Sequence, residues 1–132
     1  MTQLRPGGLL LIEEVKWIRT EHPVLGAYLE IVEAMMANRG HELYVGARLN
    51  AISEEDGWRR RSSRVARSRP SAAKAARMFS MNLANRRGDR FVRETYSSET
   101  IDRLEDGLSE LSASQSEEEI VWGLRQMVIE RT

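Results

Sequence analysis

The residues of this chain that could carry chemistry are its arginines, and they gather in one stretch. Residues 58–93 hold 12 basic groups and one acidic group, whereas residues 1–57 hold 5 and 9, and residues 94–132 hold 3 and 10. The net charge of zero therefore hides an excess of 11 positive charges in the middle of the chain. Because like charges repel in both the folded and the unfolded chain, such a cluster is typical of a protein that binds a polyanion.

Arginine is the preferred cation here, since 18 of the 20 basic residues are arginine. A guanidinium group presents five N–H donors in a planar fork, which grips a phosphate with two hydrogen bonds and stacks on a base. Such contacts neutralise phosphates without reading the base sequence. We therefore predict that RNA or single-stranded DNA binds along residues 59–93. The predicted binding residues are Arg59, Arg60, Arg61, Arg64, Arg67, Arg69, Lys74, Arg77, Arg86, Arg87, Arg90 and Arg93.

Other interpretations of the basic segment stay open. It could contact an acidic protein or the acidic flanks of the same chain, or it could be a solvated surface. Trp58, Phe91 and Tyr96 lie within or beside it, where an exposed ring could stack on an unpaired base. For Phe79 and Phe91, however, a place in the hydrophobic core is the stronger expectation.

The rest of the sequence holds no pattern typical of an enzyme. His22 and His41 stand outside any metal-ligand spacing, so surface or capping positions are expected for both. Glu13 and Glu14 are adjacent, which would point their carboxylates in different directions on a helix. The chain has no cysteine, no serine-nucleophile motif and no phosphate-loop motif. We predict a protein that is not an enzyme, with no catalytic residue, no metal and no cofactor.

Length and composition are those of one globular domain. The chain has 132 residues, of which 41% are hydrophobic and 30% charged, and a chain of this size can bury about two-thirds of its unfolded surface. The longest strongly apolar run, Leu9 to Ile12, is far shorter than the ~20 residues needed to cross a bilayer. We expect no membrane partner and a cytoplasmic location.

Hydrophobic residues recur at helical spacing along nearly the whole chain, which predicts an all-α fold. The expected architecture is a compact single-domain bundle of about five to seven helices over residues 1–132. The clearest helix begins at Pro23, a residue suited to the first helical position, and its apolar stripe continues to Gly40. A helix is also expected over Leu9–Arg19, although its buried face is ambiguous.

The arginine-rich segment is expected to be helical as well. Ser53 can cap a helix on which Arg60, Arg64 and Arg67 line one side, opposite a thin apolar face. Residues 41–52 could instead begin as a strand. No neighbouring segment offers them a strand partner, so a helix is favoured there too.

Helices are expected to continue after Pro70. Ser71 begins one, Asp89 caps a short one, and Ser116 with Glu119 forms a capping box for a last helix through residue 128. Between the short helix and the last one lies a further helix with apolar residues at 3-4-3 spacing, which could pair with the last helix as an antiparallel hairpin. The stripes expected to be buried are Ala72, Ala75, Ala76, Phe79 and Leu83 in the first helix, and Ile101, Leu104, Leu108 and Leu111 in the third. The outer face of the first helix is expected to carry Lys74, Arg77, Met78, Met81 and Asn85.

A helix-turn-helix DNA-binding module fits this pattern poorly, because the connection at residues 67–70 lacks the usual glycine and both flanking helices carry cations over their length. With its size, helical content, neutral total charge and the stretches Trp58–Arg61 and Asp89–Arg93, the chain resembles the small subunits of multi-subunit CRISPR effector complexes. The resemblance implies a compact, non-catalytic all-α protein of antiviral defence. Several copies of such a protein stack along the guide and target strands.

The function predicted from the sequence is that of a nucleic-acid-binding small subunit of a ribonucleoprotein, which holds the strand on an Arg-rich helical face. Its expected partners are nucleic acid, other protein subunits and copies of itself stacked head to tail, because the acidic block 94–132 of one copy could face the basic block of the next. The alternative is a small interaction protein, such as a phage-type inhibitor or adaptor, whose charged faces dock on another protein.

Overall fold

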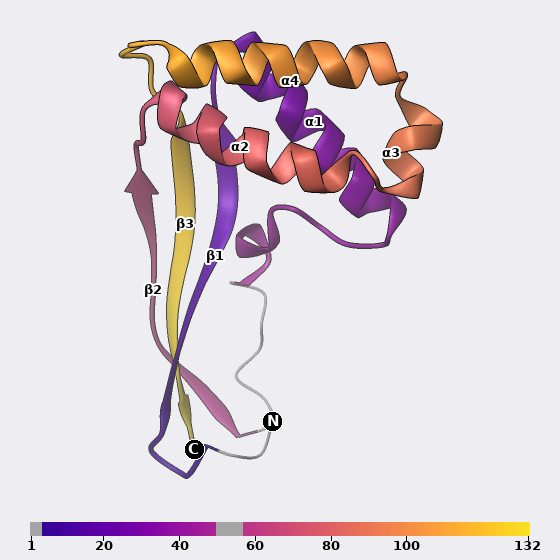
Figure 1. Ribbon diagram of the computed structural model, residues 1–132. Helices are drawn as coiled ribbons and strands as arrows, with labels where there is room; N and C mark the ends of the chain where they lie inside the picture. Colours follow the sequence, from indigo (N-terminus) through magenta and orange to yellow (C-terminus); the bar gives the residue numbers. More distant parts are fainter. Residues whose placement is uncertain (1–3, 50–56) are drawn as a thin grey trace. The chain divides into compact units, whose positions relative to one another are not determined.

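The computed structural model describes residues 4–49 and 57–132, which form four α-helices, three strands and one 3-10 helix (Figure 1). The prediction of an all-α helical bundle is therefore wrong, because the fold is mixed α/β. In chain order the elements are β1 (Leu9–Arg19), α1 (Pro23–Asn38), η1 (Val45–Ala47), β2 (Trp58–Ser68), α2 (Ala72–Arg86), α3 (Arg90–Thr95), α4 (Ser98–Ala113) and β3 (Val121–Arg131).

The chain divides into two compact units, each built from separate stretches of sequence. The sheet unit comprises residues 1–18, 44–68 and 122–132, and the helical unit comprises residues 19–43 and 69–121. The chain therefore passes from one unit to the other four times. Whether it unfolds as a single domain stays a prediction.

The sheet unit is built around three strands of 11 residues each, with β3 between β1 and β2 (Figure 1). β2 pairs antiparallel with β3 from Trp58 opposite Arg131 to Ser68 opposite Trp122. On the other side of β3, Gly7 N donates to the Arg131 carbonyl at 2.7 Å and Arg131 N donates to the Gly8 carbonyl at 2.9 Å. The residues just before β1 thus lie beside the end of β3, so β1 is antiparallel to β3 as well.

The helix expected to end at residue 128 is replaced by β3. Gly123, Arg125 and Met127 are buried while the residues between them are half-buried, which is the two-residue alternation of a strand. Ser116 and Glu119 do not form the expected capping box. Ser116 Oγ accepts from Glu118 N at 3.2 Å, and Glu119 forms a β-bridge with Ser71. No hairpin of two helices forms, because α4 is followed by a strand.

The helix expected over Leu9–Arg19 is also a strand, β1. Leu9 and Leu11 are exposed while Leu10 and Ile12 are half-buried, again with a period of two. A run of four aliphatic residues fits both the helical period of 3.6 residues and the strand period of two, which explains why the buried face of the expected helix was ambiguous. Pairing with β3, more than 100 residues later in the chain, decides in favour of the strand.

The arginine-rich helix with a cation stripe is wrong for the same reason, since its residues form β2. The shared stripe of Arg60, Arg64 and Arg67 does not exist in a strand, where alternate residues point to opposite faces. Ser53, the expected cap, lies outside the described residues. Within residues 41–49 the expected helix is also wrong, because only the short η1 forms there.

The helix predicted from Pro23 is confirmed as α1, with Pro23 in its first turn. His22 takes the capping role expected for it, since its Nδ1 accepts from Val24 N at 3.3 Å. Gly40 has a φ of +72°, a left-handed conformation that suits glycine just past the end of a helix. The buried residues of α1 are Leu25, Tyr28, Leu29, Ile31, Val32 and Met35.

Three of the four helices expected after Pro70 are confirmed as α2, α3 and α4, with Ser71, Asp89 and Ser97 as their side-chain caps. The two predicted apolar stripes are buried in full. Tyr28 and Phe79 stack in the core of the helical unit with their ring centroids 4.2 Å apart, so the expectation for Phe79 is confirmed. The buried residues are Ala72, Ala75, Ala76, Phe79 and Leu83 of α2, and Ile101, Leu104, Leu108 and Leu111 of α4.

Candidate nucleic-acid interface

β2 is an edge strand that carries five arginines and no acidic residue. All five arginine side chains are exposed, namely those of Arg59, Arg60, Arg61, Arg64 and Arg67. Charged residues on an edge strand discourage pairing with a further strand, which explains such a sequence without any binding function. Five cations without one carboxylate on the same strand exceed that need, because mixed charges or a single lysine protect an edge equally well.

The arginines of β2 point to both faces of the sheet. Residues directly opposite one another on antiparallel strands share a face. Arg59 lies opposite Glu130 and Arg64 opposite Gln126, which sets both arginines on one face. The other face carries Arg60, opposite Ile129, and Arg67, opposite Gly123. The cations therefore line the rim of the sheet instead of one flat side.

On the first face, Glu130 holds two arginines. Its Oε2 accepts from Arg59 Nη2 at 2.8 Å and lies 3.3 Å from Arg61 Nη1. The hydrogen bond from Arg59 is the main reason that the pKa of the Glu130 carboxyl lies below its ordinary value, against an opposing effect of desolvation. Both arginine side chains remain 53% exposed, so each can still meet a ligand.

A second polar chain on this face crosses all three strands. Arg64 Nε donates to Gln126 Oε1 at 2.7 Å, and Gln126 Nε2 donates to Glu13 Oε2 at 2.6 Å. The side-chain amide of Gln126, on the central strand β3, thus connects Arg64 of β2 to Glu13 of β1. These bonds orient the Arg64 guanidinium before any ligand arrives.

On the opposite face, two arginines lie over tryptophan rings. The Arg67 guanidinium lies 5.9 Å from the centre of the Trp17 ring, and the Arg131 guanidinium lies 5.3 Å from that of Trp58. Trp17 also covers Gly123, where any side chain would overlap the ring. Trp58, expected as a stacking platform for a base, is half-buried and carries Arg131 on its ring.

The register of β2 against β3 shifts between Arg60 and Ser62, so Arg61 is an extra residue without an opposite partner. An open pocket lies at this bulge. It includes one residue that the sequence analysis missed, Arg125 of β3, which is only 8% exposed. Because this part of the chain was expected to be helical and lies outside the basic block, no sequence signal pointed to Arg125. The pocket is lined by Arg60, Arg61, Ser62, Ser63 and Arg125.

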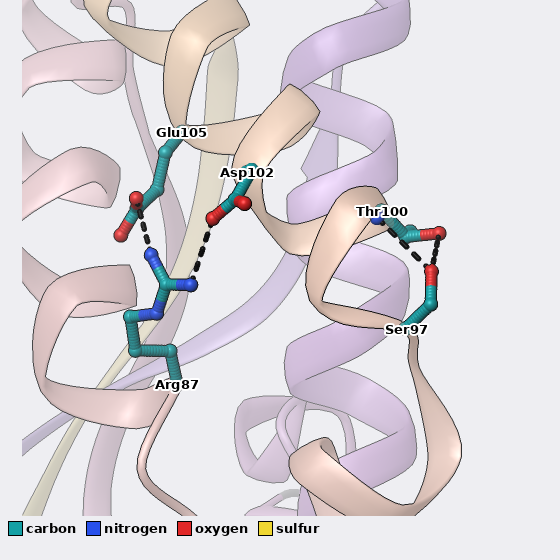
Figure 2. Close-up of polar contacts among 5 residues, drawn as sticks. All are labelled: Arg87, Ser97, Thr100, Asp102 and Glu105. Carbon is teal, nitrogen blue, oxygen red and sulfur yellow. Dashed lines mark hydrogen bonds and ion pairs between the residues drawn. The ribbon is translucent and has the colours of Figure 1, made fainter.

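The other seven predicted binding residues belong to the helical unit, and three of them pair with its carboxylates. Arg87 contacts both Asp102, at 2.8 Å, and Glu105, at 2.5 Å, as Figure 2 shows. These hydrogen bonds, that to Asp102 foremost, raise the pKa of Arg87. Arg69 and Arg90 form ion pairs with Glu119 and Glu94, at 3.6 and 2.8 Å. The acidic flanks of the chain therefore satisfy part of the basic block, one of the alternatives left open by the sequence.

Lys74, Arg77, Arg86 and Arg93 form no ion pair with any residue that the structure describes. Lys74 and Arg77 lie on the exposed side of α2, as predicted, together with Met78, Met81 and Asn85. The aromatic residues beside the basic block interact with each other, since Phe91, half-buried, meets Tyr96 edge-on at 6.4 Å between ring centroids.

The two units carry opposite net charges. The sheet unit has 10 basic and 6 acidic residues, a net charge of +4, whereas the helical unit has 10 basic and 14 acidic residues, a net charge of −4. The sequence-level block of 12 basic residues is thus divided between a cationic unit, which keeps five of them on β2, and an anionic unit, which keeps seven. A polyanion is attracted to the first and repelled by the second.

Within the described parts of the chain, no three His, Cys, Asp or Glu side chains are close enough to hold a metal ion. None of the helices there has the length and apolar character to cross a membrane. No known protein family and no curated protein matches this chain.

Proposed function

We propose that the sheet unit binds the backbone of a single nucleic-acid strand, RNA or single-stranded DNA, through the arginines of β2. The observation that carries the proposal is an exposed edge strand with five arginines and no carboxylate, on the unit with a net charge of +4. Four of these arginines are oriented by a neighbouring side chain and yet stay exposed: Arg59 and Arg61 by Glu130, Arg64 by Gln126 and Arg67 by Trp17. Orientation before binding reduces the entropy lost when a guanidinium takes a phosphate.

The dimensions of β2 suit an extended ligand. Eleven strand residues at about 3.3 Å each span roughly 36 Å, and cations occur along most of that length. A single strand of several nucleotides can therefore lie along the rim with a phosphate near each guanidinium. None of these contacts involves a base edge, so we expect little sequence preference and a strong dependence on salt.

The prediction that several copies act within a ribonucleoprotein is kept as part of this proposal. The resemblance to CRISPR small subunits rested partly on helical content, which is lower than expected, but its arginine-rich stretch at residues 58–61 lies on the exposed rim. The mass of complexes formed on oligonucleotides of increasing length tests this step. A one-to-one complex at every length would remove the stacking of copies and leave strand binding in place.

A second function, docking on another protein, is favoured by a different observation. Met78 and Met81 on α2 are 47% and 67% exposed, and Leu9 and Leu11 on β1 are 61% and 70% exposed. Exposed methionine and leucine side chains are frequent at protein contacts. Binding of the isolated protein to oligonucleotides of unrelated sequence separates the two functions, because an adaptor of this kind needs no such affinity.

The first prediction tests the role of β2 with two matched triple variants. Replacing Arg59, Arg64 and Arg67 with glutamine removes three positive charges from the sheet unit and leaves the bulge pocket intact. We expect affinity for a labelled single strand, measured by fluorescence anisotropy, to fall about tenfold or more. The slope of log affinity against log salt should become shallower by about 2, since each phosphate contact on a single strand contributes about 0.7.

The control variant replaces Lys74, Arg77 and Arg93 with glutamine, which removes the same charge from exposed positions of the helical unit. We expect this variant to keep most of its affinity. If the control loses as much affinity as the β2 variant, binding does not depend on β2. Far-UV circular dichroism of both variants checks that the loss is not one of folding.

A further inference from the structure

The sheet contains a buried cation, Arg125, that pairs with none of the described carboxylates. Arg125, in the central strand β3, is the one buried polar or charged residue among those that the structure describes. Its Nη1 donates to Ser63 Oγ at 3.2 Å, and its Nε is buried without any hydrogen-bond partner there. No described carboxylate forms an ion pair with it. Burying a charge in this way is costly unless something compensates for it.

The bulge in β2 brings further donors to the same place. Arg60 lies opposite Ile129 and Ser63 lies opposite Met127, so both share the face of the sheet that carries Arg125. Residues three apart in a regular strand point to opposite faces, and only the extra residue at Arg61 gives these two the same side. A bulge costs ladder hydrogen bonds, and bulges are frequent where a side chain must be aimed at a binding site.

All the charged side chains that line the pocket are hydrogen-bond donors. Three arginines and two serines line it, and no carboxylate does. Its volume of about 540 Å³ lies within the roughly 300–1,000 Å³ of small-ligand sites, so a phosphate can enter with the sugar attached to it. The pocket is shallow and broadly open to solvent, so such a ligand can reach it directly.

We propose that this pocket binds one phosphate group, with Arg125 as its buried end and Arg60 and Arg61 closing on it from the rim. A terminal phosphate offers three free oxygens to the three guanidiniums and the serine hydroxyls, whereas a phosphodiester, like a carboxylate, offers two. Its charge compensates Arg125 inside the sheet. The further claim that this phosphate belongs to a nucleic acid rests on the proposed function. It is either a terminal phosphate or a phosphodiester within the strand.

The test uses the tryptophan fluorescence of the whole chain, since Trp17, Trp58 and Trp122 all belong to the sheet unit. Thermal unfolding is followed in low-millimolar inorganic phosphate and in potassium chloride at the same ionic strength, because more concentrated phosphate stabilises any folded protein by its exclusion from the surface. A ligand that binds only the folded state raises the melting temperature. We expect phosphate to raise that of the wild-type protein above its value in chloride.

Arg125→Met removes the buried cation and puts a shorter, unbranched apolar side chain in its place. We expect this variant to bind phosphate about tenfold or more weakly, so that phosphate and chloride give the same melting temperature. Arg67→Gln is the matched control, because it removes a cation from β2 outside the pocket and should retain the phosphate effect. Each variant is compared with itself in the two salts, so a change in its own stability does not affect the result. If Arg125→Met does not fold, Ser63→Ala with Arg60→Gln weakens the same pocket from its exposed side.

A wild-type protein that melts at the same temperature in phosphate and in chloride would overturn the pocket, as would a phosphate effect that persists in Arg125→Met. Either result leaves the proposed function standing if oligonucleotides still bind. Conversely, a phosphate effect without oligonucleotide binding supports the pocket and removes the proposed function.

Oligonucleotides with and without a 5′-phosphate then identify the source of the phosphate. If a terminal phosphate enters the pocket, it should strengthen binding to the wild-type protein severalfold, and this gain should vanish in Arg125→Met. If a phosphodiester enters, both oligonucleotides should bind the wild-type protein equally and lose affinity together in the variant. Equal affinity of both oligonucleotides for wild-type protein and variant alike would overturn the pocket as a site for nucleic acid.

Discussion

Two arginines of β2 share one carboxylate, that of Glu130. Exposed ion pairs contribute little to stability on average, because the charges are well solvated apart. Their effect on binding is more direct. Glu130 orients Arg59 and Arg61 on the rim of the sheet, but its negative charge offsets one positive charge and repels any phosphate that approaches them. Arg61 also lines the bulge pocket, so the same carboxylate acts on both proposed sites.

Replacing Glu130 with glutamine should therefore strengthen binding to single strands by severalfold, measured by anisotropy at low salt. The gain should shrink as salt rises, because screening weakens the repulsion that the carboxylate exerts. Gln126→Glu is the opposite control, since it adds a carboxylate beside Arg64 on the same face and should weaken binding. Unchanged affinity in both variants would mean that phosphates do not approach this face.

The acid stability of the sheet should depend on the same residue. The pKa of Glu130 in the folded protein lies below its ordinary value of 4.5, so its interaction with Arg59 and Arg61 is fully present above that pH. The contribution is lost as the pH falls through the lowered folded-state value. The wild-type protein should therefore be more stable than Glu130→Gln near neutral pH, and the difference should disappear in stronger acid. Urea unfolding followed by tryptophan fluorescence measures it. A difference that is constant with pH would rule out this contribution.

At the scale of elements, the sheet unit depends on close packing between β1 and β3. The Trp17 ring lies directly on Gly123 of the central strand and reaches towards Arg67 of β2. A glycine weakens a strand by its backbone entropy, and an aromatic ring from the neighbouring strand restores the missing contacts. One ring thus links all three strands on the face that bears Arg60 and Arg67.

Gly123→Ala should destabilise the sheet, because the added methyl group overlaps the Trp17 ring. Overpacking of this kind costs about 1–3 kcal/mol, and we expect a loss in that range by urea unfolding followed by fluorescence. Gly26→Ala in α1 is the control, since nothing lies within 4 Å of its added methyl group. It should be neutral or stabilising by up to ~1 kcal/mol, as alanine favours a helix over glycine. Equal effects of the two substitutions would contradict the packing of Trp17 on Gly123.

At the scale of the whole molecule, the two units differ in how much they bury. Of the nineteen buried hydrophobic residues among those described, only Leu49 and Met127 belong to the sheet unit. A small sheet with one exposed, highly charged edge strand is marginally stable by itself. The helical unit has the larger apolar core, and its net negative charge does not favour a polyanion. Most of the buried apolar residues and the proposed binding strand thus belong to different units.

We expect the sheet unit to unfold before the helical unit on heating. Tryptophan fluorescence reports the first unit, and far-UV circular dichroism reports chiefly the helices of the second. The melting midpoint measured by fluorescence should lie below the midpoint measured by circular dichroism. A bound oligonucleotide should raise the fluorescence midpoint more than the circular dichroism midpoint. Coincident midpoints with and without ligand would show a single cooperative domain, which is the organisation that the chain length suggested.

Local sequence signals predict the helices of the helical unit. Ser71 and Asp89 are side-chain caps, Pro23 opens a helix, and the apolar stripes of α2 and α4 repeat every three or four residues. Each of these signals lies within one turn or one helix, so it can be read without knowledge of the rest of the chain. The clustering of arginine at residues 59–67 was equally visible, because charge does not depend on conformation.

Residues 9–19, 58–68 and 121–131 are strands because they pair with segments that are distant in the sequence. Short segments with mixed apolar and polar residues fit both periods, and a strand gains its hydrogen bonds from a partner that is distant in sequence. β2 pairs with β3 across about 60 residues, and the shift in their register at Arg61 sets Arg60, Ser63 and Arg125 around one pocket. The positions of the arginines are a property of the sequence. Their division between two units, and the place of Arg125 among them, follow from long-range pairing, which no local pattern encodes.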